Sequence, residues 1–119
     1  MKELFNPGHI NCSAGVELEF SARNVNPLFF LIRHLNGDWG DVDSEEWQEN
    51  ENALVAHGRL FSRYTAPFGE VWIITTADRL ETYMCFPHQY MAWATGLRED
   101  DQNTASALRK PPFEDPSSN

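Results

Sequence analysis

The pattern of apolar and polar positions divides the chain into a helical first half and a β-rich second half. Three apolar segments in the first half fit helices: 14–23, 27–36 and 44–57. Three segments rich in β-branched and aromatic residues then fit strands joined by short turns: 59–65, 71–76 and 81–86. We therefore expect one α+β domain over residues 1–95, with N-terminal helices packed on one face of a three- to four-stranded antiparallel meander.

Local signals support these boundaries. Ser13 precedes the first helix, Asn26 and Pro27 begin the second, and Asp43 with Glu46 has the form of a capping box for the third. Gly58 closes the third helix. The first helical segment also has alternating apolar positions, so its pattern would equally allow a strand. The second is apolar on nearly every side and is expected to lie under other elements.

Two shorter elements are also expected. A short strand fits residues 9–11, and one or two helical turns fit residues 88–96. From Arg98 onward the chain is polar and rich in Pro, which predicts a flexible tail over residues 96–119.

Turn lengths predict the register of the meander if each hairpin loop has four residues, 66–69 and 77–80. One face then carries side chains suited to packing against the helices: Leu60, Ser62, Tyr64, Val71, Ile73, Thr75, Thr82, Met84 and Phe86. The other face carries Arg59, Phe61, Arg63, Trp72, Ile74, Thr76, Glu81, Tyr83 and Cys85. Three helices cover only one side well, so this second face is expected to be partly open.

The charge is strongly acidic and unevenly distributed. The 119 residues hold 18 Asp and Glu against 9 Lys and Arg, a formal charge of −9, and residues 38–51 carry seven acids and no base. A field of this sign opposes binding to phosphate backbones, so direct nucleic-acid binding is not expected. The acidic run is either a solvated helix face or a surface that meets a basic protein partner or imitates DNA.

These patterns define two candidate binding surfaces. The acidic surface comprises Asp38, Trp39, Asp41, Glu45, Glu46 and Glu49. The Arg/aromatic sheet face comprises Arg59, Phe61, Arg63, Trp72 and Tyr83, which has the composition of interface hot spots. The alternative for the second surface is that the N-terminal segment or a second copy of the chain, in a homodimer, covers it.

Catalytic chemistry has one candidate. His34 ends the second helix, and with Ser62, Tyr64 or Thr75 from the sheet it could serve acid–base cleavage of RNA, by analogy with the fold of small ribonucleases. The alternative is a structural role, in which His34 caps its helix and bonds Asp38. No His stands at a metal-ligand spacing from another His or a Cys, and no nucleotide-binding motif is present, so no metal or cofactor is expected.

Two motifs carry a resemblance. Gly37-Asp38-Trp39-Gly40-Asp41 and Trp72-Ile73-Ile74-Thr75, followed by Ala77-Asp78-Arg79, are similar to a family of small proteins encoded on bacterial plasmids and integrative elements. Its members are labelled plasmid-related or restriction-associated, and no activity is established for the family. The chain departs from the family pattern at Thr76 and Leu80. The resemblance implies a bacterial protein carried by mobile DNA.

Together these observations favour a non-enzymatic acidic protein-binding module of a mobile genetic element, countering host defence in the manner of an anti-restriction or anti-CRISPR protein. The alternative is a small RNase-like enzyme that uses His34 with Ser62 and Tyr64. Two cysteines, no apolar run near 18 residues and no signal peptide predict a cytoplasmic protein without membrane contact.

Overall fold

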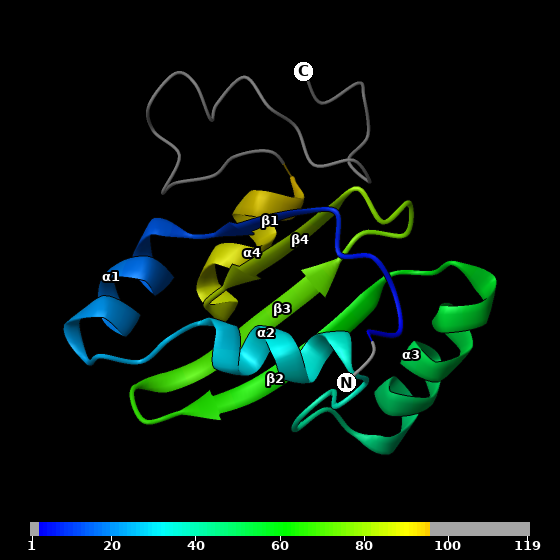
Figure 1. Ribbon diagram of the computed structural model, residues 1–119, viewed down its shortest axis with the longest axis horizontal. Helices are drawn as coiled ribbons and strands as arrows, with labels where there is room; N and C mark the ends of the chain where they lie inside the picture. Colours follow the sequence, from blue (N-terminus) through cyan, green and yellow to red (C-terminus); the bar gives the residue numbers. More distant parts are fainter. Residues whose placement is uncertain (1–2, 96–119) are drawn as a thin grey trace.

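The computed structural model describes residues 3–95, which form an α+β fold (Figure 1). The elements follow in the order β1 (His9–Cys12), α1 (Ala14–Ala22), α2 (Leu28–Leu35), α3 (Ser44–Ala56), β2 (Leu60–Ala66), β3 (Gly69–Thr75), β4 (Glu81–Cys85) and α4 (Pro87–Ala94). The expected tail over residues 96–119 lies outside the described residues.

The antiparallel meander has the register predicted from its turns. Tyr64 lies opposite Val71 in the β2–β3 pair, and Thr75 lies opposite Thr82 in the β3–β4 pair. The two faces therefore carry the side chains assigned to them from the sequence.

The sheet as a whole is mixed, so the prediction of a purely antiparallel sheet was wrong. Its order is β1-β4-β3-β2, and β1 runs parallel to β4 with Ile10 opposite Thr82. Backbone bonds from the His9 N–H to the Leu80 carbonyl and from the Ser13 N–H to the Met84 carbonyl, both 2.9 Å, extend this pairing at each end. A four-residue strand carries no local signal of its partner's direction, which depends on pairing with residues 72 positions further along the chain.

The predicted starts of α1 and α3 are confirmed, whereas α2 begins at Leu28 with Pro27 as its N-cap, one residue later than expected. Ser13 Oγ accepts the Val16 N–H at 3.1 Å at the start of α1. Asp43 Oδ1 accepts the Glu46 N–H at 2.7 Å, and Glu46 Oε1 accepts the Asp43 N–H at 3.2 Å, which completes a capping box on α3. α3 ends at Ala56 because His57 takes a left-handed φ of 61°, one residue before the expected Gly58.

The main core lies between α1, α2 and the first face of the sheet. Its buried members are Val16, Phe20, Phe30, Leu31, Leu35, Tyr64, Ala66, Val71, Ile73 and Met84. This is the face that the sequence assigned to helix packing.

α2 is less covered than its apolar sequence predicts. Phe30, Leu31 and Leu35 face the sheet, but Leu28, Phe29 and Ile32 are 52%, 61% and 52% exposed. The expectation that this helix lies wholly under other elements was therefore wrong, because the sheet covers only one side of it.

α4 covers part of the second face, which was expected to be partly open, and it corrects the prediction that the packed helices are N-terminal. It packs on that face, where Trp93 stacks on Tyr83 with ring centroids 4.9 Å apart. Tyr83 is only 2% exposed and Cys85 is fully buried, so Tyr83 is not available as a surface contact. Phe61 and Trp72 remain half-buried at the uncovered end. No helix within residues 3–95 is long and apolar enough to cross a bilayer.

Candidate functional site

A small pocket forms where the aromatic end of the second sheet face meets two helices. We call it the aromatic pocket; it has a volume of about 200 Å³ and is lined by Glu46, Arg59, Phe61, Trp72 and Tyr90. These residues come from α3, the residue before β2, β2, β3 and α4. Four of them (all but Glu46) lie on or next to the Arg/aromatic face, and Glu46 belongs to the acidic surface, so the pocket joins the two predicted surfaces.

Three rings form the wall of the aromatic pocket. Phe61 and Trp72 meet edge to face, with centroids 5.0 Å apart and an interplanar angle of 82°, and Trp72 and Tyr90 lie 5.5 Å apart at 65°. Such T-shaped contacts are favoured by ring quadrupoles. Trp72 Nε1 also donates to Glu70 Oε2 at 2.8 Å, which sets the orientation of the indole.

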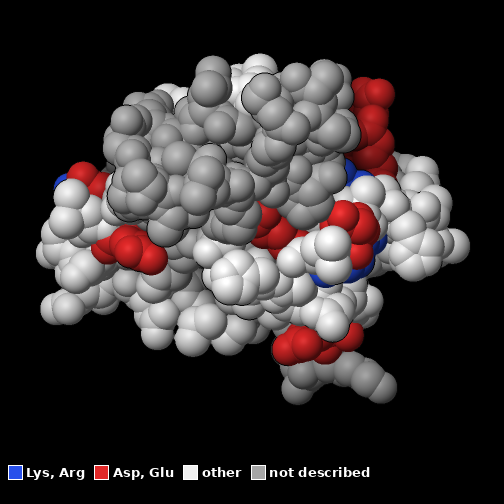
Figure 2. Space-filling model, turned by 90° about the horizontal axis from the view of Figure 1, so that it is seen from above, with Lys and Arg blue, Asp and Glu red and all other residues white. Residues whose placement is uncertain are grey.

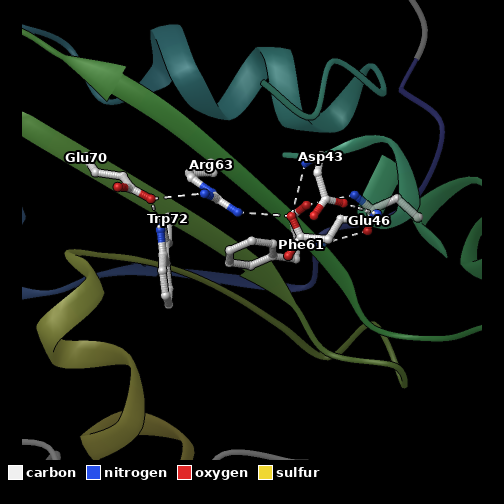
Figure 3. Close-up of polar contacts among 7 residues, drawn as sticks. Asp43, Glu46, Phe61, Arg63, Glu70 and Trp72 are labelled. Carbon is white, nitrogen blue, oxygen red and sulfur yellow. Dashed lines mark hydrogen bonds and ion pairs between the residues drawn. The ribbon is translucent and has the colours of Figure 1, made fainter. Parts of the chain in front are cut away.

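Arg63 links the acids on either side of the rings (Figure 3). Its Nη2 donates to Glu46 Oε1 at 3.0 Å, and its Nε lies 3.4 Å from Glu70 Oε2. All three side chains are about one-third exposed or more, so each pair contributes less than about 1 kcal/mol. The sequence predicts Arg63 as part of a binding surface, but in the fold its guanidinium already pairs with two carboxylates of the protein itself.

Arg59 lies at the mouth of the aromatic pocket. Its guanidinium is 5.8 Å from the centroid of the Phe61 ring, and its Nη1 donates to the Tyr90 hydroxyl at 2.5 Å. Arg23, Arg33 and Arg63 each pair with a carboxylate, and Arg79 donates to backbone carbonyls. Among the arginines of residues 3–95, Arg59 is the one held by an aromatic ring and a hydroxyl alone.

Two acids of the acidic surface, both on α3, have no partner among the described residues. Glu45 and Glu49 are exposed and form no ion pair or hydrogen bond with any residue in 3–95. Asn50 positions this helix against the sheet, since its amide donates to the Phe61 carbonyl at 2.7 Å and accepts the Phe61 N–H at 3.0 Å. Figure 2 shows acidic side chains in several patches on one face of the described residues, some of them beside basic side chains.

The Asp38–Asp41 part of the predicted acidic surface is structural. Trp39 is fully buried and donates its Nε1–H to Glu51 Oε2 at 2.9 Å, so it is not a surface contact. Asp38 accepts from Arg33 Nε at 2.7 Å, and this hydrogen bond lowers the pKa of the Asp38 carboxyl. The Asp41 N–H donates to the Arg63 carbonyl at 2.6 Å. This loop therefore covers the outer edge of β2.

Gly40 explains why this loop needs a glycine. Its φ is +79°, and a Cβ there would lie 2.1 Å from the Arg63 carbonyl oxygen. Only glycine permits so close an approach of the loop to the strand.

His34 lies inside the core, in a chain of hydroxyl groups. Its Nδ1 is 2.6 Å from Ser62 Oγ, and its Nε2 is 2.9 Å from Thr75 Oγ1. Thr75 Oγ1 is 2.7 Å from Thr82 Oγ1, which donates to the Pro7 carbonyl at 2.7 Å. The His34 ring does not bond Asp38, which contradicts the alternative of a histidine that caps its helix and bonds Asp38.

The direction of this chain assigns the His34 tautomer. A hydroxyl has one proton, and that of Thr82 goes to Pro7, so Thr75 must donate to Thr82. Thr75 then accepts from His34 Nε2–H, and Nδ1 accepts from Ser62. The imidazole is neutral, and burial together with the nearby Arg79 charge lowers its pKa to about 3.

The residues of the catalytic alternative are close together but shielded from solvent. His34 and Ser62 are fully buried, Tyr64 is 1% exposed, and none of the three lines the aromatic pocket. The Tyr64 hydroxyl donates to the Asp38 carbonyl at 2.7 Å, and burial raises its pKa. A general acid or base must come within hydrogen-bond reach of its substrate, and the full burial of His34 among the described residues argues against such contact.

The Ala77-Asp78-Arg79 turn also has a structural role. Asp78 Oδ1 accepts the Leu80 N–H at 3.0 Å, as its turn chemistry predicts. Arg79 does not pair with Asp78 or Glu81; its guanidinium donates to the Ala53 and Gly58 carbonyls at 3.0 and 2.7 Å. These carbonyls lie at the end of α3, where a cation is favoured by the helix dipole.

Two contributors to the aromatic pocket were missed from the sequence. Tyr90 lines the pocket and lies in the segment that the sequence predicts only as one or two helical turns. Glu70 bonds the Trp72 indole and is the second residue of β3, just before the strand expected over residues 71–76. The alternation of β3 could have placed Glu70 beside Trp72, whereas no local signal folds α4 back over the sheet.

A second hollow, of about 430 Å³, was also not predicted. It is lined by Glu19, Arg23, Phe68, Phe86, Pro87 and His88. Arg23 pairs with Glu19 and lies 5.0 Å over the Phe68 ring, so the polar groups at its rim already engage each other.

Comparison with known proteins adds no relative. The chain matches no protein-family model, no curated protein and no solved structure. In residues 3–95, no group of three or more His, Cys, Asp or Glu side chains is arranged to hold a metal ion.

Proposed function

We propose that this protein is a binding module that engages a basic surface of another protein, such as the nucleic-acid-binding surface of a host defence enzyme. The observation that carries the proposal is the pair Glu45 and Glu49, exposed and uncompensated beside the aromatic pocket. An acidic patch next to partly buried aromatic rings combines electrostatic steering with an apolar anchor.

The resemblance to plasmid-borne proteins supports the biological setting of this proposal. A protein carried by mobile DNA and acting in the bacterial cytoplasm gains from blocking restriction or CRISPR enzymes, whose DNA-binding surfaces are basic. An acidic patch offers such a surface a substitute for phosphate charge. The overall charge of −9 supports the same choice of partner.

The test is capture of a partner from bacterial lysate, with the bound proteins identified by mass spectrometry. The double variant Glu45→Lys, Glu49→Lys should lose the captured partner, because the attraction becomes repulsion. The matched control is Glu3→Lys, Glu17→Lys, which makes the same charge change at exposed positions outside α3 and should retain the partner. Raising the salt concentration should release it.

Equal capture by both double variants would show that the acidic surface of α3 is not the binding surface. Sedimentation of the purified chain separates hetero-binding from the alternative of a homodimer. RNA cleavage that disappears in His34→Ala would instead favour the RNase-like alternative, against which the full burial of His34 argues.

A further inference from the structure

We infer that the aromatic pocket accepts one arginine side chain of the partner, and that Arg59 holds the same aromatic surface until the partner displaces it. This inference rests on the proposed function and names the chemistry of its central contact.

The size of the aromatic pocket limits its occupant. Its volume of about 200 Å³ is below the roughly 300–1,000 Å³ of sites for drug-sized ligands. It also lies between exposed side chains of α3 and the end of the sheet, which a protein surface can reach. One long side chain is therefore a better match than a metabolite.

The lining of the aromatic pocket matches a guanidinium. Phe61, Trp72 and Tyr90 line it with aromatic rings, and a planar cation stacks favourably on such rings. Glu46 Oε1 is engaged by Arg63 and the Asp43 N–H, whereas Glu46 Oε2 forms no hydrogen bond with any residue in 3–95. This second oxygen can accept from the incoming guanidinium.

Arg59 shows that this surface holds a guanidinium. It lies over Phe61 and donates to Tyr90 without an ion pair to any described residue, so little beyond these two contacts fixes its position. Exposed side chains change rotamer within nanoseconds, which allows exchange with a partner side chain. Arg59 is thus an internal competitor whose removal should favour binding.

An anionic occupant fits the surroundings less well. Glu46 lines the aromatic pocket, Glu70 bonds the Trp72 indole, and Glu45 lies next to Glu46 in α3. A carboxylate or phosphate entering here would meet these charges, and Arg59 is the one basic residue among those that line the aromatic pocket. The two occupants therefore predict opposite effects of removing Arg59.

The experiment is an NMR titration of the full-length ¹⁵N-labelled chain, following the indole N–H signal of Trp72, which Trp72→Phe assigns. The probe is the blocked peptide acetyl-Gly-Arg-Gly-amide, compared with the same peptide carrying Lys or Glu. We expect a saturable shift that is strongest with Arg. Arg59→Ala should tighten the apparent Kd by about threefold, and Glu46→Gln should weaken it by about threefold.

The variants are chosen so that the fold survives. Gln at position 46 can still form the capping box with Asp43, and Glu70 still pairs with Arg63. Arg23→Ala removes the same charge from the other hollow and is the control for Arg59→Ala; it should leave the Kd unchanged.

The inference is overturned if no shift saturates, if the Glu peptide binds better, or if Arg59→Ala weakens binding of the Arg peptide. Its failure is separable from that of the proposed function. If the peptide does not bind while Glu45→Lys, Glu49→Lys still abolishes partner capture, the aromatic pocket is excluded and the acidic surface stands. If the peptide binds but partner capture is insensitive to that double variant, the acidic surface is excluded and the aromatic pocket stands as a binding site for arginine.

Discussion

His34 shows how one residue can tie the fold together without reaching the surface. Its ring and the hydroxyls of Ser62, Thr75 and Thr82 join α2 to β2, β3 and β4, and the last hydroxyl bonds the Pro7 carbonyl. Phe5 and Trp39 pack edge to face against the ring, with centroids 5.3 and 5.5 Å from it. Every polar atom of the ring is satisfied only while His34 is neutral.

This neutrality predicts a loss of stability in acid. In the unfolded chain His34 takes up a proton below its ordinary pKa of 6.5, but in the fold its pKa is about 3. The stability that the neutral ring contributes is complete above pH 6.5 and falls by about 1.4 kcal/mol per pH unit between these values. Between pH 7 and pH 4.5 the loss should reach about 3 kcal/mol.

The measurement is urea unfolding of the wild type and His34→Gln at both pH values. Because glutamine does not titrate, the stability difference between the two proteins should shrink by this amount in acid. His88→Gln, at an exposed position, is the matched control. A wild-type advantage that stays constant with pH would mean that His34 takes up its proton at the same pH in the fold as in the unfolded chain.

At the scale of elements, α2 is apolar on both of its sides, but only one side is buried against the sheet. Leu31 is 5% exposed in the main core, and its neighbour Ile32 is 52% exposed. Apolar periodicity could not separate the two sides, because nearly all positions of the helix are apolar.

This difference predicts unequal costs for the same substitution. Leu31→Ala should lower the free energy of unfolding by about 2–5 kcal/mol, since it leaves a cavity in the core. Ile32→Ala should change it by less than about 1 kcal/mol, because little buried area is lost and alanine favours the helix. Denaturant unfolding of both variants checks this, and equal losses would show that Ile32 is covered in solution.

The outer edge of β2 is another element-scale feature. Asn50 pairs with the backbone of Phe61, and Trp39 and Asp41 pair with the backbone of Arg63. These contacts use the hydrogen-bonding groups that an edge strand would otherwise offer to another chain. The loop sequence Gly37-Asp38-Trp39-Gly40-Asp41, which looked like a binding motif, is explained by this edge protection.

At the scale of the whole molecule, the aromatic pocket depends on packing between distant segments. Asn50, which is 3% exposed, connects α3 to the sheet through two hydrogen bonds with the backbone of Phe61. It thereby also positions Glu46, which lies one helical turn earlier. The pocket walls also require α4 to fold back over β3.

Asn50→Asp should therefore destabilise the protein by about 1–3 kcal/mol, because a carboxylate cannot donate to the Phe61 carbonyl and is left facing it. The same substitution at exposed Asn52 changes charge equally and keeps the acceptor that Gln48 uses. Thermal unfolding compares the two variants, and Asn50→Asp should also shift the Trp72 indole signal. Equal melting temperatures of the two variants would show that the hydrogen bonds of Asn50 do not hold α3 against the sheet.

Local chemistry was sufficient to predict much of this protein. Caps at Ser13 and Asp43, the strand alternation and the two short turns predicted the helix starts, the meander register and the side chains on each sheet face, since all depend on neighbours within a few residues. Composition and strand alternation likewise predicted an acidic surface and an aromatic face, because charge and ring content can be counted without the fold.

Only the tertiary structure decided which of those groups reach the surface. Burial depends on what packs from elsewhere in the chain: α4 covers Tyr83, the sheet encloses His34, and the loop before α3 turns Trp39 inward. The parallel pairing of β1 with β4 and the meeting of Glu46 with Trp72 and Tyr90 arise the same way. Contacts between residues far apart in sequence follow from how whole elements fill space, which no local pattern encodes.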